Sequence, residues 1–133
     1  MFGKGKETKP QNRIDSLIGA GTQVEGNIRF AGGLRIDGEV KGCVAASDGA
    51  TSSTLVVSEQ ARIEGAVDVA HLVINGTVVG PVVVTESLEM QPKARIVGDV
   101  EYSIIEMHQG AVIEGRLVHR PGKSVELKLA ASN

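Results

Sequence analysis

Three histidines and a set of carboxylates are the side chains of this 133-residue chain with the most scope for catalysis or metal binding. His71, His108 and His119 are general bases or zinc ligands wherever a fold brings them together. Cys43 is the only cysteine, which excludes an internal disulfide and a cysteine zinc site. Acid or base chemistry would fall to a larger set of carboxylates: Asp37, Glu39, Glu64, Asp68, Asp99, Glu101 and Glu114.

Two short motifs resemble parts of phosphate-binding loops but lack the rest of the pattern. The segment Gly122-Lys123-Ser124 would need a glycine at position 117, which is Leu117, and Gly3-Lys4-Gly5-Lys6 has no strand before it. A formal net charge of −2 offers no basic stripe for nucleic acid, and the few aromatics form no stacking platform: Phe2, Phe30 and Tyr102. We therefore expect no nucleotide, nucleic acid or cofactor to bind.

A repeated aliphatic pattern positions all these residues and occupies the chain from Ile14 to Val118. One form reads small-x-aliphatic-x-Gly-x-aliphatic and begins at Thr22, Ala61, Ala94 and Ala111. A second form, as in LRIDGEVKGCV, begins at Leu34 and Leu72. The two forms alternate imperfectly over six turns, because the last two turns are both of the first form.

The spacing of equivalent glycines gives the length of one turn. Gly98 and Gly115 are 17 residues apart, and Gly65 and Gly98 are 33 apart across two turns. The 38 residues from Gly38 to Gly76 are five too many, and the surplus falls in residues 45–54, whose composition is that of a surface loop. One insertion thus restores a period of 16 or 17 residues.

Within each turn, aliphatic residues and glycines alternate with charged residues, which indicates strands with one buried face. A turn of 16 or 17 residues fits a roughly triangular coil of three short strands, with glycines near the corners. We therefore predict an all-β parallel solenoid of about six coils over residues 14–118. Residues 1–13 and 119–133 are predicted to be disordered polar tails, although the second, with alternating Val125, Leu127 and Leu129, is alternatively a partial cap.

The main alternative is an enzyme on a left-handed β-helix, such as a hexapeptide-repeat acyltransferase or a trimeric carbonic anhydrase. Ile18, Val24, Phe30 and Ile36 keep a six-residue step, but the step fails at Gly42 and the later turns are shorter than 18 residues. The histidines are separated by 37 and 11 residues, which are not multiples of a coil. The carboxylates fall largely in the outward register. We therefore expect no enzyme, no catalytic residue and no metal site.

The two end coils are predicted to be the functional surfaces, because neither tail has the composition of a cap. Each end would leave aliphatic side chains and unpaired strand edges open to another copy, and two such ends make a linear polymer. At the N-terminal end these residues are Leu17, Ile18, Val24, Ile28 and Phe30. At the C-terminal end they are Ile104, Ile105, Val112, Ile113, Leu117 and Val118. Head-to-head, tail-to-tail and head-to-tail contacts all stay open.

The ordered turns, with LRIDGEVKG at 34–42 and GAVIEG at 110–115, resemble a bactofilin domain. This resemblance implies a right-handed triangular β-helix and a cytoskeletal protein that assembles into filaments without nucleotide. It also implies a scaffold for cell-wall or morphogenetic proteins and a short N-terminal membrane-targeting segment. A soluble, monomeric solenoid that binds a ligand or catalyses a reaction is the second hypothesis.

The segment MFGKGK resembles the membrane-targeting segment of that family. Met1 and Phe2 would enter the lipid interface, while Lys4 and Lys6 would favour an anionic leaflet. No apolar run approaches the roughly 20 residues of a membrane span. We therefore expect a cytoplasmic protein held peripherally on the inner face of the cytoplasmic membrane, with a merely solubilising tail as the alternative.

Overall fold

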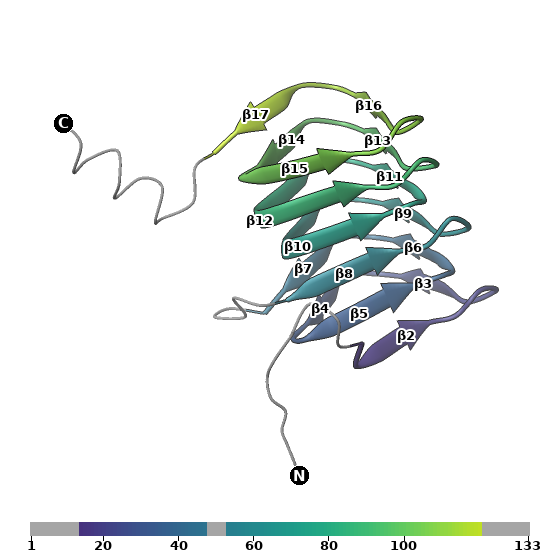
Figure 1. Ribbon diagram of the computed structural model, residues 1–133. Coiled ribbons are helices and arrows are strands. Elements are labelled where there is room, and N and C mark those ends of the chain that lie inside the picture. The colour runs from purple at the N-terminus through teal and green to yellow at the C-terminus, as the bar shows by residue number, and fades with distance from the viewer. Residues whose placement is uncertain (1–13, 48–52, 121–133) are drawn as a thin grey trace, which may run out of the picture.

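The computed structural model describes residues 14–47 and 53–120. Within these residues every regular element is a strand, and all strand pairs are parallel (Figure 1). The strands wind into a solenoid of six stacked coils, and each coil contributes three strand segments. The predicted all-β parallel solenoid of about six coils is confirmed, while the right-handed sense of the coil stays a prediction.

Three faces make up the solenoid. The first is a six-stranded sheet of β3 (Gln23–Glu25), β6 (Glu39–Lys41), β9 (Arg62–Glu64), β11 (Thr77–Val79), β13 (Arg95–Val97) and β16 (Val112–Glu114). The second contains β4 (Ile28–Phe30), β7 (Val44–Ala46), β14 (Val100–Tyr102) and β17 (Leu117–His119). The third contains β2 (Ser16–Ile18), β5 (Gly33–Ile36), β8 (Thr54–Val57) and β15 (Ile104–Met107). Two long strands join the second and third faces into one ten-stranded sheet: β10 (Val67–Ile74) and β12 (Val82–Met90).

Columns of aliphatic side chains run along the inside of each face. On the first face Val40, Ile63, Val78 and Ile96 occupy successive coils in register and are fully buried. Branched aliphatic residues suit this arrangement because they favour strands and pack closely against their neighbours on the pleated surface. The alternation of inward and outward residues predicted from the sequence is therefore present, and the core needs no large aromatic residue.

The surplus residues in the repeat lie between the second and third coils. Val44 pairs with Val67, which is 23 positions later, whereas Val67 pairs with Val82, only 15 positions later. Strand β7 ends at Ala46 and β8 begins at Thr54, so the ends of the predicted loop segment 45–54 belong to strands. The middle of that segment, residues 48–52, lies outside the described residues.

The two sequence forms differ in the corner between the third and first faces. Where the second form occurs, this corner is short, as at Asp37-Gly38 and Asn75-Gly76. In the other coils it is a four-residue turn closed by a backbone hydrogen bond, such as the one of 2.9 Å from the amide of Ala61 to the carbonyl of Ser58. The last two coils both have long corners, which explains the imperfect alternation of the sequence.

At the next corner, between the first and second faces, glycines with positive φ recur in every coil: Gly26, Gly42, Gly65, Gly80, Gly98 and Gly115. The predicted placement of glycine near corners is confirmed. Strand β17 runs to His119, one position into the predicted C-terminal tail. The remaining tail segments, 1–13 and 121–133, lie outside the described residues. No helix among the described residues has the length and apolar character needed to cross a membrane.

Candidate assembly surfaces

The outermost strands of every face lie at the two ends of the rod. Strands β2, β3 and β4 form the first coil, and β15, β16 and β17 form the last. Each pairs on one side only, and the described part of the chain places no strand against the other side. Unpaired N–H and C=O groups along such an edge are a template for pairing with another chain. Both ends of the rod therefore present the backbone chemistry that continues a parallel ladder.

The last coil extends three of the buried aliphatic columns. Ile105, Ile113 and Leu117 are in register with the buried residues Leu88, Ile96 and Val100 of the coil before. Val100 is fully buried, whereas 48% of Leu117 is exposed. The difference arises because Val100 has a coil on both sides and Leu117 has one on a single side. Three of the predicted residues thus form an open apolar end surface.

The other three residues predicted for the C-terminal end have a different orientation. Val112, Val118 and Ile104 are in register with outward residues of the preceding coil, and all three are exposed. Ile104 is the most exposed, at 66%. They therefore lie on the lateral faces of the last coil, beside the inward columns rather than within them.

The N-terminal coil repeats this division. Ile18, Val24 and Ile28 are partly buried and belong to inward columns, and Phe30 is buried. Leu17 is in register with the exposed Arg35, so it points outward, and 60% of it is exposed. The apolar surface at this end is therefore made chiefly by Ile18, Val24 and Ile28.

Two exposed apolar residues of the end coils were not predicted. Met107 continues the inward column of Ile74 and Met90, yet it is 44% exposed because no coil follows it. Ile14 precedes the first strand and is 43% exposed. The signal for Met107 was present in the sequence, since it lies 17 residues after Met90.

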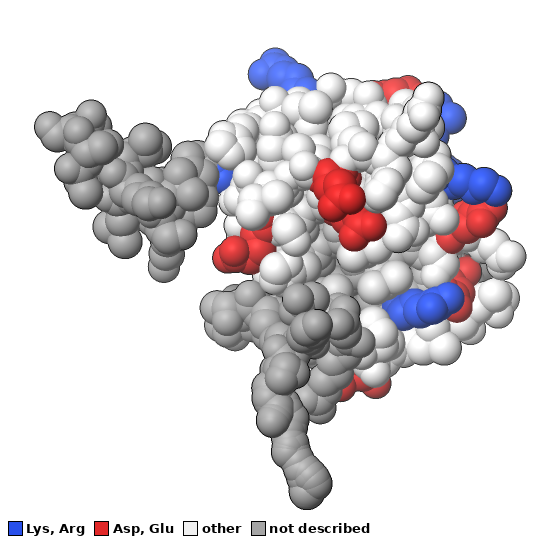
Figure 2. Space-filling view, viewed as in Figure 1, with Lys and Arg blue, Asp and Glu red and all other residues white. Residues whose placement is uncertain are grey.

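The lateral faces carry paired charges of both signs. Arg62 and Glu64 form an ion pair of 2.8 Å on the first face, and this partner lowers the pKa of Glu64. The Ser58 hydroxyl and then Arg35 donate hydrogen bonds to Asp37 and lower the pKa of that carboxyl. Figure 2 shows one side of the rod, where acidic and basic side chains are scattered without a continuous patch of either sign. Such mixed charge disfavours side-to-side association of rods.

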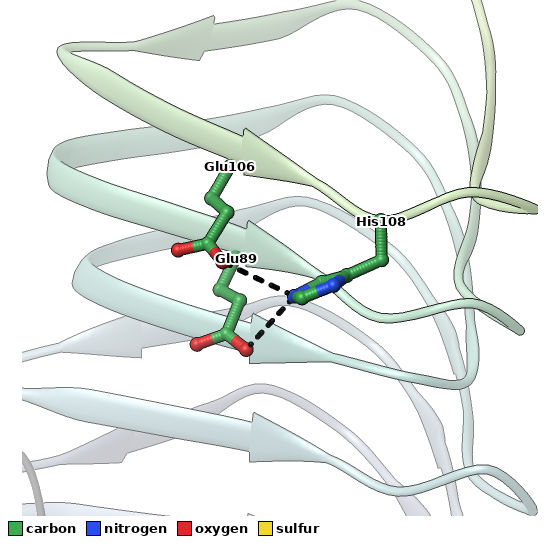
Figure 3. Close-up of side chains that lie close together, drawn as sticks. All are labelled: Glu89, Glu106 and His108. Carbon is green, nitrogen blue, oxygen red and sulfur yellow. Dashed lines mark ion pairs between the residues drawn. The ribbon is translucent and has the colours of Figure 1, made fainter.

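The three histidines lie in three different columns, as predicted from their spacing. Nδ1 of His71 is 2.8 Å from the Ser87 hydroxyl oxygen. The ring of His119 packs at a centroid distance of 5.4 Å from that of Tyr102. His108 follows β15 and faces two glutamates (Figure 3). The described residues therefore contain no column of histidines that could form the zinc site of a carbonic anhydrase, and Cys43 is exposed on another face.

Comparison with known proteins gives one family and two relatives. A family model described as "Bactofilin: Polymer-forming cytoskeletal" matches residues 16–118. Bactofilin BacP of Myxococcus xanthus strain DK1622 is 27% identical over 113 residues, which cover 84% of this chain and 45% of BacP. Bactofilin BacO of the same strain is 26% identical over 103 residues, covering 77% of this chain and 78% of BacO. The chain thus spans about half the length of BacP, and no solved structure matches it.

Proposed function

The chain belongs to the bactofilin family of polymer-forming cytoskeletal proteins, and from this premise we propose that its two end coils join copies end to end into filaments that need no nucleotide. The lateral faces then form the side of the filament. Head-to-head with tail-to-tail contacts, and head-to-tail contacts, both satisfy the two open ends. The proposal covers the mode of assembly, since polymer formation is the property of the family.

One observation carries this proposal: the aliphatic columns of the core continue without interruption to both ends. Ile113 and Leu117 at one end, and Val24 and Ile28 at the other, occupy the same inward positions as fully buried residues of the middle coils. Burying each such side chain contributes about 1.5–3 kcal/mol. A further coil of a second copy would bury these columns and pair the free strand edges at the same time.

Sedimentation of the purified full-length chain tests the proposal directly. We expect the protein to pellet as filaments above a threshold concentration in buffer without nucleotide, and electron microscopy of the pellet to show thin fibres. Added ATP or GTP should leave the pelleted fraction unchanged, because the contact consists of apolar columns and backbone edges. A chain that stays monomeric at high concentration, or pellets only with nucleotide, would contradict end-to-end assembly of this kind.

We further propose that the filament is tethered to the inner face of the cytoplasmic membrane and recruits cell-wall or morphogenetic proteins there. Met1, Phe2, Lys4 and Lys6 support the tether by their chemistry, although they lie outside the described residues. One buried Phe contributes about 1.5–3 kcal/mol and each lysine near an anionic surface about 1 kcal/mol. This affinity is weak for one protomer and becomes strong when many tails on one filament act together.

Deleting residues 1–6 is expected to abolish flotation of the protein with anionic vesicles while filaments still form. The reason is that the deletion removes the apolar anchor and two lysines but no residue of an end coil. Deletion of an equally long segment at the other terminus, residues 128–133, serves as the control and should leave vesicle binding intact. Undiminished flotation without residues 1–6 would refute the tether.

A further inference from the structure

Glu89, Glu106 and His108 form a cluster on the third face, between the last two coils (Figure 3). Glu89 on β12 and Glu106 on β15 are direct neighbours across the parallel ladder, and His108 follows two residues after Glu106. One ligand atom from each residue lies within 4.8 Å of the others. Sequence reasoning missed this cluster, although the 17-residue spacing of the glutamates equals one coil.

The separations within the cluster match those between ligands of one metal ion. Nε2 of His108 lies 3.4 Å from Oε2 of Glu89 and 3.3 Å from Oε2 of Glu106. These distances are longer than an ordinary N–H···O hydrogen bond of about 2.9 Å. Zinc binds imidazole nitrogen and carboxylate oxygen at about 2.0–2.2 Å, which places tetrahedral ligands about 3.4 Å apart. The ring nitrogen is therefore spaced from both carboxylates as a zinc ligand would be.

The charge around the cluster points the same way. Five other carboxylates have an arginine or lysine within ion-pair distance: Asp37, Glu59, Glu64, Glu101 and Glu114. In the described part of the chain, His108 is the sole ion-pair partner of Glu89 and of Glu106. Like charges directly opposite each other on neighbouring strands are destabilising. A cation held between the two carboxylates would remove this repulsion.

We propose that Glu89, Glu106 and His108 bind one divalent transition-metal ion of the zinc class. Imidazole with two carboxylates suits zinc or cobalt, whereas magnesium and calcium favour oxygen ligands alone. The backbone supports the site, because the amide of His108 donates a 2.9 Å hydrogen bond to the carbonyl of Met90. The ion bridges β12 and β15, so it clamps the last coil, which has a neighbour on one side only, to the coil before it.

Titration of the full-length chain with Co²⁺ alone tests the site, because cobalt in a tetrahedral site has strong visible absorption bands. We expect saturation at one ion per chain and displacement by Zn²⁺. His108→Gln and Glu106→Gln should each weaken binding by at least about 10-fold. His119→Gln removes another exposed histidine of the same coil and should bind as the wild type does. Cys43→Ser should also bind normally, since Cys43 belongs to a different face.

Hydrogen exchange separates a clamp from passive binding. Zinc should slow amide exchange in β15 of the wild type and of His119→Gln, and should leave exchange in His108→Gln unchanged. Cobalt binding that is equal in wild type and His108→Gln, or that exceeds one ion per chain without tetrahedral bands, would overturn the proposal. A filament that pellets normally while its cobalt site is absent would overturn the metal site alone.

Discussion

Replacing Ile113 with arginine is expected to dissolve the filaments while leaving the coils folded. Ile113 packs on the inward side of the last coil in register with Ile96, so in an end-to-end contact its side chain would be covered by the next copy. An unpaired charge buried in that contact costs about 3–5 kcal/mol, which corresponds to at least a 100-fold rise in the concentration needed for assembly. Sedimentation at a series of concentrations measures this shift directly.

The control for Ile113→Arg is Glu86→Arg, which places the same side chain at an exposed lateral position of β12. This variant should pellet as the wild type does, and circular dichroism should show the same strand content in both variants. The size of the soluble Ile113→Arg species also identifies the contact: dimers indicate that like ends meet, and monomers indicate head-to-tail assembly. If Ile113→Arg pellets at the wild-type concentration, the C-terminal end surface is not part of the filament contact.

Much of the fold was predictable because a solenoid repeats one local rule. Ile63, Val78 and Ile96 are recognisable as one column from their spacing and from the glycine two positions later, and parallel pairing then follows from stacking alone. The insertion after Val44 was located by the same arithmetic. The corner lengths were not predicted, because a short Asp-Gly corner and a long turn such as Ser58–Ala61 serve equally well between identical strands.

The candidate surfaces were predictable only as groups of apolar residues. Sequence spacing identified the last coil but did not separate inward Ile113 from outward Val112, since both are aliphatic and adjacent. The cluster at His108 was missed for a related reason. Equal histidine spacing was the pattern sought, while the observed arrangement combines a histidine with glutamates from two coils. Such mixed clusters depend on side-chain direction, which the repeat does not encode.

Replacing Gly80 with alanine is expected to lower the free energy of unfolding by about 3 kcal/mol or more. Gly80 has a φ of +145°, and a Cβ atom built on it would lie 2.4 Å from the carbonyl oxygen of Gly65 in the coil before. Backbone cannot move aside there without breaking the ladder between β9 and β11. Urea unfolding in the Ile113→Arg background, which keeps protomers soluble, measures the loss.

Two matched glycines separate backbone strain from the close approach of coils. Gly26 occupies the same corner in the first coil with a φ of +130°, but no atom lies within 4 Å of an added Cβ. Gly26→Ala should therefore cost only the strain, about 1–2 kcal/mol. Gly19→Ala meets neither obstacle and should change stability by less than about 1 kcal/mol. Equal losses at Gly80 and Gly26 would show that the stacking distance has no energetic role.

The space beyond Gly26 also reports on the N-terminal end of the filament. In each later coil the Cβ built on the equivalent glycine points at the carbonyl of the coil before, as Gly42 does at Gly26. A second copy that continues the ladder below the first coil would place its own backbone in that position. Gly26→Ala should then weaken assembly of the otherwise wild-type chain more than it weakens folding. Normal filaments from this variant would show that the N-terminal contact is made by the apolar side chains without continued strand pairing.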